Sequence, residues 1–123
     1  MTFYHWTTKE AYPSIKLEGL IPHQGQHCRD IHDRSHDRIF LCKEEDVPFW
    51  RKCFYDVEVL LTIEIDSSWL HDNMNWRKMK SAPSGMEYGA KTEIPPDWIV
   101  DVKFIDRDDF DREMKLYNAK YHK

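Results

Sequence analysis

The chain has 123 residues and a formal net charge of −4, and 33% of its residues are charged. This charge balance argues against broad nucleic-acid binding and leaves only a local basic patch open. The 6 phenylalanines, 5 tryptophans and 6 tyrosines argue against disorder, because each such side chain buries a large area. We therefore expect one domain over residues 1–123, with a small aromatic core.

The cysteines and the apolar segments bear on the cellular setting. Cys28, Cys42 and Cys53 are odd in number and lack C-x-x-C spacing, which is typical of reduced thiols and not of a disulfide framework. No apolar run approaches the roughly 20 residues that span a bilayer, and no signal peptide opens the chain. We expect a cytoplasmic protein that has no membrane partner.

The first elements follow from local patterns. Residues 2–7 are β-branched or aromatic apart from one histidine, which predicts a strand. A helix should follow, either capped by Thr8 or carrying Pro13 in its first turn, and Gly19 should end it. The polar stretch 23–37 has no apolar period and predicts a long loop.

A short buried strand is expected at 38–42, and a helix should begin at Asp46. The apolar face of that helix is expected to consist of Phe49, Trp50 and Cys53. Alternating apolar residues over 57–65 predict a half-buried strand.

The last third of the chain is expected to hold a short helical turn at 67–72, an irregular segment at 73–85, and strands at 86–90 and 98–105. In the last strand we expect Trp98, Val100, Val102 and Phe104 to face one way. The tail from residue 107 is predicted to be helical, with Phe110, Met114 and Tyr117 on one face. Together these elements predict a small α+β domain.

A short motif near the start of the chain is the first candidate for chemistry. It reads Tyr4-His5-Trp6-Thr7, and Gly19-Leu20-Ile21-Pro22 follows the expected helix. A histidine in the middle of a strand can point a ring nitrogen at a sugar hydroxyl, while the neighbouring backbone stays open to an amide. The alternative is that a nearby carbonyl satisfies the His5 ring as part of the fold.

This order of motifs resembles the opening of the ADP-ribosyltransferase superfamily, in which an H-x-T strand precedes a helix and a Gly-Leu-x-Pro exit. The resemblance is strongest to the DarT-like enzymes, which carry a similar Pro-Ser-Ile-x-x-x-Gly-Leu helix, here residues 13–20. It implies an α+β fold in which two small twisted sheets form a cleft for NAD. It also implies that His5 holds a ribose hydroxyl, that the Trp6 backbone holds the nicotinamide amide, and that Thr7 supports the strand or donates to the ligand.

Two later segments extend the resemblance. The central strand of the superfamily carries an aromatic residue, and Phe40 stands at that position, with a role either in stacking or in the core. In DarT-like proteins the catalytic glutamate lies ahead of an Ile/Val-Pro-Pro turn, and the matching register here gives Glu87. Glu93 is the rival carboxylate because it lies beside the turn.

The implied reaction uses NAD as a co-substrate. Cleavage of the bond between nicotinamide and ribose passes through an oxocarbenium-like transition state, which a fixed carboxylate stabilises. The pyrophosphate needs cations, for which Arg29, Arg34 and Arg38 are candidates, and Arg38 is preferred because it adjoins the aromatic strand. The resemblance thus implies transfer of ADP-ribose to a macromolecular acceptor, a protein or a nucleic acid, with release of nicotinamide.

Two other functions stay open. Phenylalanine in place of the superfamily's tyrosine at position 40 leaves room for a non-catalytic module of the same fold that binds NAD, ADP-ribose or a protein. A zinc-binding module is the second alternative, suggested by His23, His27, Cys28, His32 and His36. Structural zinc sites usually draw on two separated ligand pairs in which thiolates dominate, so we expect no metal and a polar loop over a cleft.

Overall fold

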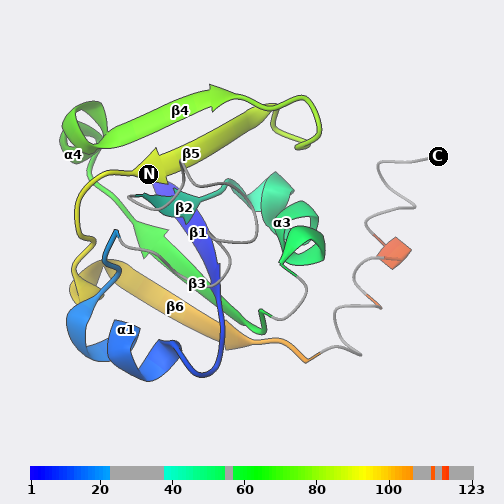
Figure 1. Ribbon diagram of the computed structural model, residues 1–123, viewed down its shortest axis with the longest axis horizontal. Helices are drawn as coiled ribbons and strands as arrows, with labels where there is room; N and C mark the ends of the chain where they lie inside the picture. The colour runs from blue at the N-terminus through cyan, green and yellow to red at the C-terminus, as the bar shows by residue number, and fades with distance from the viewer. Residues whose placement is uncertain (23–37, 55–56, 107–111, 113–114, 117–123) are drawn as a thin grey trace.

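The computed structural model describes residues 1–22, 38–54, 57–106, 112, 115 and 116 (Figure 1). Within these residues the strands form two three-stranded antiparallel sheets, with the orders β1-β3-β6 and β2-β5-β4. The protein is therefore α+β with two small sheets, as predicted. Predictions for the long loop at 23–37 fall outside the described residues, as does nearly all of the tail from residue 107.

The first sheet contains β1 (Thr2–Thr7), β3 (Val59–Glu64) and β6 (Ile99–Phe104). β3 is the central strand, and the alternating residues predicted to face the core are all buried. Leu60, on the opposite face, is also buried at 7% exposure. The prediction of a half-buried strand is therefore wrong at this position, because side chains cover both faces of β3 there.

The predicted apolar face of the last strand is only partly formed. The pairing of β6 with β3 skips Val100, so this residue is an extra one in the ladder. A bulge of this kind interrupts the alternation of side chains. Val100 is 57% exposed as a result. Phe104 is also exposed and places its ring edge-on to the ring of Tyr12, with the centroids 5.6 Å apart.

The second sheet contains β2 (Ile39–Leu41), β4 (Met74–Lys78) and β5 (Met86–Ala90). The prediction of an irregular segment at 73–85 is wrong, because β4 pairs with β5 along its whole length. β4 is an edge strand of five residues in which only Met74 and Trp76 are apolar, and Trp76 is 61% exposed, so the pattern is too short to mark a half-buried strand.

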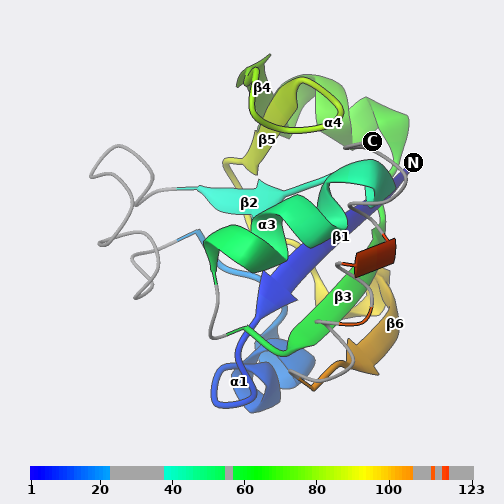
Figure 2. The same cartoon turned by 90° about the vertical axis from the view of Figure 1, so that its right-hand side faces the viewer.

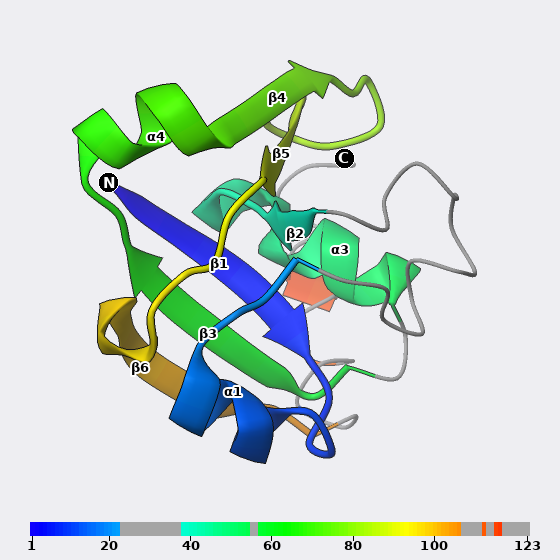
Figure 3. The same ribbon diagram turned by 60° about the vertical axis from the view of Figure 1, so that its left-hand side comes forward.

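The helices pack around the sheets (Figures 2 and 3). They are α1 (Tyr12–Glu18), α3 (Val47–Cys53) and α4 (Ser67–Asn73), together with the short 3-10 turns η2 (Glu44–Asp46) and η3 (Pro96–Trp98). α1 and α4 lie at opposite ends of the molecule, and α3 lies beside β1 and β2. None of the described helices has the length and the apolar character needed to cross a membrane.

Two helix predictions need correction. Ala11 and not Thr8 stands at the N-cap of α1, while Pro13 lies in the first turn, which was the other alternative. The Thr8 hydroxyl instead accepts a hydrogen bond from the Ala11 backbone N–H at 3.1 Å. In α3, Cys53 is exposed, and Arg51 is buried at 1% exposure. The Arg51 guanidinium lies over the Trp6 ring, 5.5 Å from its centroid, which gives the buried cation an aromatic partner.

Contacts between the sheets create a common core. The rings of Phe3 and Tyr88 meet edge to face, with their centroids 5.4 Å apart. At the edge of β1, Tyr4 and Cys42 exchange two backbone hydrogen bonds of 2.8 and 2.9 Å. A backbone bridge thus joins the two sheets between β1 and the residue that follows β2. β1 and β2 separate beyond this bridge.

Candidate functional site

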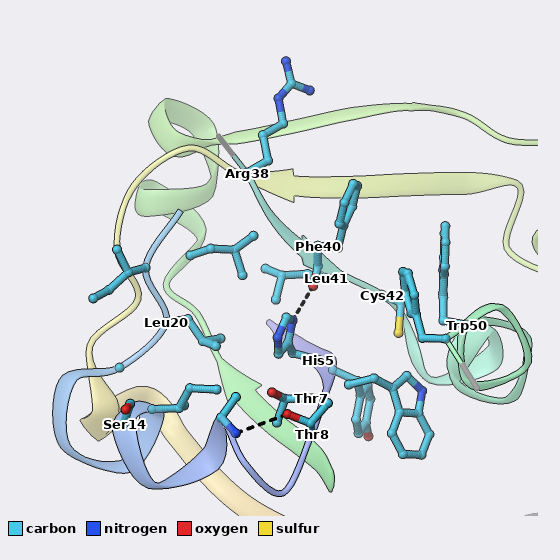
Figure 4. Close-up of a pocket in the computed structure, with 18 of the residues that line it drawn as sticks. His5, Thr7, Thr8, Ser14, Leu20, Arg38, Phe40, Leu41, Cys42 and Trp50 are labelled. Carbon is cyan, nitrogen blue, oxygen red and sulfur yellow. Dashed lines mark hydrogen bonds between the residues drawn. The ribbon is translucent and has the colours of Figure 1, made fainter. Parts of the chain in front are cut away.

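A pocket of about 530 Å³ opens where β1 and β2 separate, with α1 and α3 at its sides (Figure 4). This volume lies within the roughly 300–1,000 Å³ typical of small-molecule sites. The residues predicted to bind NAD all line it, namely His5, Trp6, Thr7, Arg38 and Phe40. They come from two segments of the sequence that only the fold brings together.

The His5 ring spans the opening between the two strands. Its Nδ1 lies 2.7 Å from the carbonyl oxygen of Phe40. Since a carbonyl only accepts, Nδ1 must carry the proton in this contact. The alternative that a nearby carbonyl satisfies the His5 ring is therefore confirmed, while contact of this ring with a sugar hydroxyl stays a prediction for a residue that also lines the pocket.

The backbone and the side chain of Trp6 point in different directions, the backbone toward the pocket and the indole toward α3. Backbone polar groups alternate between the two edges of a strand, and those of Tyr4 point at Cys42. The N–H and carbonyl of Trp6 therefore point to the same edge of β1, where the pocket lies. Its indole N–H donates to the Val47 carbonyl at 2.8 Å, and the residue as a whole is only 7% exposed. The backbone is thus placed for a ligand while the indole holds α3.

An aromatic wall forms one side of the pocket. It consists of Phe40, Trp50 and Phe54, all of which line the pocket. The rings of Phe40 and Trp50 are 6.4 Å apart and inclined by 21°, and those of Trp50 and Phe54 are 5.6 Å apart and inclined by 16°. Sequence reasoning missed the role of Trp50 and Phe54 in the site, although the aromatic density of this helix was visible in the sequence.

Arg38 lies at the rim of the pocket. Its aliphatic portion packs over Gly89, where a Cβ would come within 3.1 Å of the Arg38 Cδ. Its guanidinium extends past β5 and away from His5 (Figure 4). A role for Arg38 in binding pyrophosphate stays a prediction. The alternatives Arg29 and Arg34 lie outside the described residues.

Glu87 lies on β5 and is not among the residues that line the pocket. Its Oε1 is 2.6 Å from the Nε of Arg77, and its side chain is only 12% exposed. Gly89 pairs directly with Phe40, so Glu87, two residues earlier, shares the sheet face of Phe40. Such diagonal neighbours lie about 7–8 Å apart, within reach of long side chains. Glu93 is exposed in the segment after β5.

Burial controls the ionisation of two side chains that line the pocket. It raises the pKa of the Cys42 thiol well above its usual range, and the nearby Asp46 carboxylate adds to the shift. Burial, followed by the charge of Glu44, raises the pKa of the Tyr4 phenol. Both groups therefore stay protonated at neutral pH, which makes Cys42 a poor nucleophile.

The described residues include no group of three or more histidine, cysteine or acidic side chains placed to hold a metal ion. The histidine-rich stretch that suggested zinc lies outside them. Comparison of the chain with models of protein families and with curated proteins gives no match. The functional interpretation therefore depends on the pocket and its chemistry.

Proposed function

We propose that this protein binds NAD in the pocket between β1 and β2 and transfers ADP-ribose to a macromolecular acceptor, a protein or a nucleic acid, with release of nicotinamide. The observation that carries the proposal is the meeting of the His5-Trp6-Thr7 segment with Phe40 around this pocket. These are the positions to which the sequence resemblance to ADP-ribosyltransferases assigns NAD binding.

The chemistry of the lining suits NAD. The aromatic wall offers flat apolar faces to a planar ring. The outward edge of β1 offers the Trp6 N–H and carbonyl, which match the acceptor and the donor of a carboxamide. His5 Nε2 is the acceptor we assign to a ribose hydroxyl. A pocket with an apolar wall and a few convergent polar groups is typical of a small-molecule site.

Glu87 supplies the charge that the reaction requires. As the glycosidic bond breaks, its electron pair leaves with nicotinamide, and positive charge develops on the ribose. The acceptor then attacks the ribose carbon and loses a proton to solvent or to a nearby base. Arg77 engages Oε1 of Glu87, and we assign Oε2 to the ribose side. A preorganised carboxylate there stabilises the oxocarbenium-like transition state.

The experiment combines equilibrium binding of NAD with turnover of labelled NAD in the presence of a cell lysate. Glu87→Gln should lower nicotinamide release by roughly a hundredfold or more while NAD binding is kept. Glu93→Gln, a matched change at an exposed carboxylate near the same strand, should have no effect. A protein that neither binds NAD nor consumes it with any lysate would refute the proposal. Unchanged activity in Glu87→Gln would exclude Glu87 as the catalytic carboxylate.

Two observations favour a second candidate, a module that binds NAD or ADP-ribose without turnover. The Glu87 carboxylate is engaged by Arg77, and Phe40 lacks the hydroxyl that the superfamily's tyrosine carries. This candidate predicts that the protein binds NAD or ADP-ribose and releases no nicotinamide under any condition in which the ligand is bound.

A further inference from the structure

A buried carboxylate outside the pocket takes no part in the proposed reaction. Asp46 is 0% exposed and immediately precedes α3, where an aspartate typically caps the helix. Its side chain makes no capping hydrogen bond. Instead, the Ser84 backbone N–H donates to Oδ1 at 2.8 Å, and the Ser84 hydroxyl donates to Oδ2. Both carboxylate oxygens are thus bonded to a residue 38 positions away.

The hydrogen bonds between Asp46 and Ser84 replace the hydration of the buried carboxylate. A buried charge is costly unless hydrogen bonds replace its hydration, and here one residue supplies a bond to each oxygen. Ser84 lies in the loop at 79–85 between β4 and β5, three residues before Glu87. The loop is closed on itself by the bond from the Met79 N–H to the Gly85 carbonyl at 2.8 Å. Asp46 therefore anchors, as one unit, the loop that leads directly into the strand of Glu87.

The neighbouring residue connects the same point to the pocket. The Val47 carbonyl accepts the hydrogen bond of the Trp6 indole at 2.8 Å. Two consecutive residues at the start of α3 thus hold β1 on one side and the β4–β5 loop on the other. Trp50, one turn further along α3, belongs to the aromatic wall. The start of α3 is therefore bonded both to β1, the strand proposed to bind NAD, and to the loop that leads to Glu87.

We propose that Asp46 and Ser84 are positioning residues that hold the Glu87 carboxylate in register with the pocket. This inference rests on the proposed function, because it assigns the pair to the step that Glu87 promotes. Neither residue lines the pocket, and the hydrogen bonds between them lead to Glu87 through the loop and β5. Loss of the pair should therefore slow bond cleavage and leave the affinity for NAD unchanged.

The test compares Ser84→Ala with Ser81→Ala, a matched change at an exposed serine of the same loop. Ser84→Ala removes the hydroxyl donor and keeps the amide donor. We expect it to lower the rate of nicotinamide release by roughly 10- to 100-fold, as is typical when the support of a catalytic group is removed, with an unchanged Kd for NAD. Ser84→Thr, which keeps the hydroxyl, should restore the rate. Ser81→Ala should behave as the wild type.

A double variant separates positioning from stability. In the Glu87→Gln background, Ser84→Ala should cause no further loss, because the group through which it acts is already gone. All rates are measured well below the melting temperature of each variant. If Ser84→Ala does not fold, Asp46→Asn takes its place with the same expectation, because an amide nitrogen cannot accept the hydroxyl proton of Ser84.

The outcomes distinguish the two proposals. If the wild type releases no nicotinamide, the proposed function fails and the positioning role fails with it. If the wild type is active and Ser84→Ala is equally active, or if it loses activity further in the Glu87→Gln background, only the positioning role is overturned. A weaker Kd for NAD in Ser84→Ala would overturn it as well, since the pair would then shape the pocket itself.

Discussion

Replacement of Gly19 by alanine tests how closely the end of α1, which lines the pocket, packs against the segment that contains Ile94. Gly19 ends α1 with a φ of 81° and lines the pocket. A Cβ on it would lie 2.1 Å from the carbonyl oxygen of Ile94 and 3.0 Å from the ring of Pro96. The contact with the Ile94 oxygen is more than an ångström too short. Because this oxygen belongs to the backbone, it cannot rotate away as the end of a flexible side chain can.

The expected cost is the sum of separate effects. The backbone of Gly19 has φ 81° and ψ −167°, a region that only glycine adopts readily, and this conformation costs alanine about 1–3 kcal/mol. Relief of the clash must move Ile94, which exchanges two backbone hydrogen bonds of 2.9 Å with Leu20. These bonds contribute about 1 kcal/mol each, and overpacking adds about 1–3 kcal/mol. We expect Gly19→Ala to lower the free energy of unfolding by about 4–8 kcal/mol, a large part of the ~5–15 kcal/mol available to a domain.

Gly85→Ala is the matched control. Gly85 has a φ of 78°, and a Cβ there would meet nothing within 4 Å. It should therefore cost only the conformational part, about 1–2 kcal/mol. Urea unfolding followed by tryptophan fluorescence measures both variants, provided that the m-value is unchanged. Equal losses in the two variants would refute the reasoning, because the Ile94 contact would then contribute nothing.

Four further predictions concern residues that line the pocket. His5→Ala should weaken NAD binding by about tenfold, the value of one hydrogen bond, and His71→Ala at an 88% exposed histidine should not, as calorimetry can measure. Trp6→Phe should lower the free energy of unfolding by about 1–3 kcal/mol, because the Val47 carbonyl loses its donor. Denaturant unfolding measures this loss, and a loss below this range would contradict the prediction. Native Cys42 should resist alkylation at pH 8 and react in urea, as peptide mass spectrometry can follow, because burial raises the pKa of its thiol. The raised pKa also means that the unfolded thiol ionises first, so stability should fall as the pH rises past the ordinary value of 9.0, and Cys42→Ala should reduce that slope.

The sequence was most informative where local patterns decide the structure. β1, the end of α1 at Gly19 and the alternation along β3 follow from preferences that neighbouring residues impose on one another. The strands that carry His5 and Glu87 were predicted at 2–7 and 86–90, and β1 and β5 have these bounds in the structure. β4 was missed because an exposed edge strand needs no apolar alternation, and its pairing with β5 is what makes it a strand.

The tertiary structure alone decided which residues meet. Asp46 has the sequence position of a helix cap, yet a serine far along the chain takes both of its oxygens. Trp6 lies in the predicted motif, but only the fold sends its indole to α3 and its backbone to the pocket edge. Such partners depend on strand register and on the order of strands in each sheet. Local preference carries no information about these, because they follow from burying all the apolar faces at once.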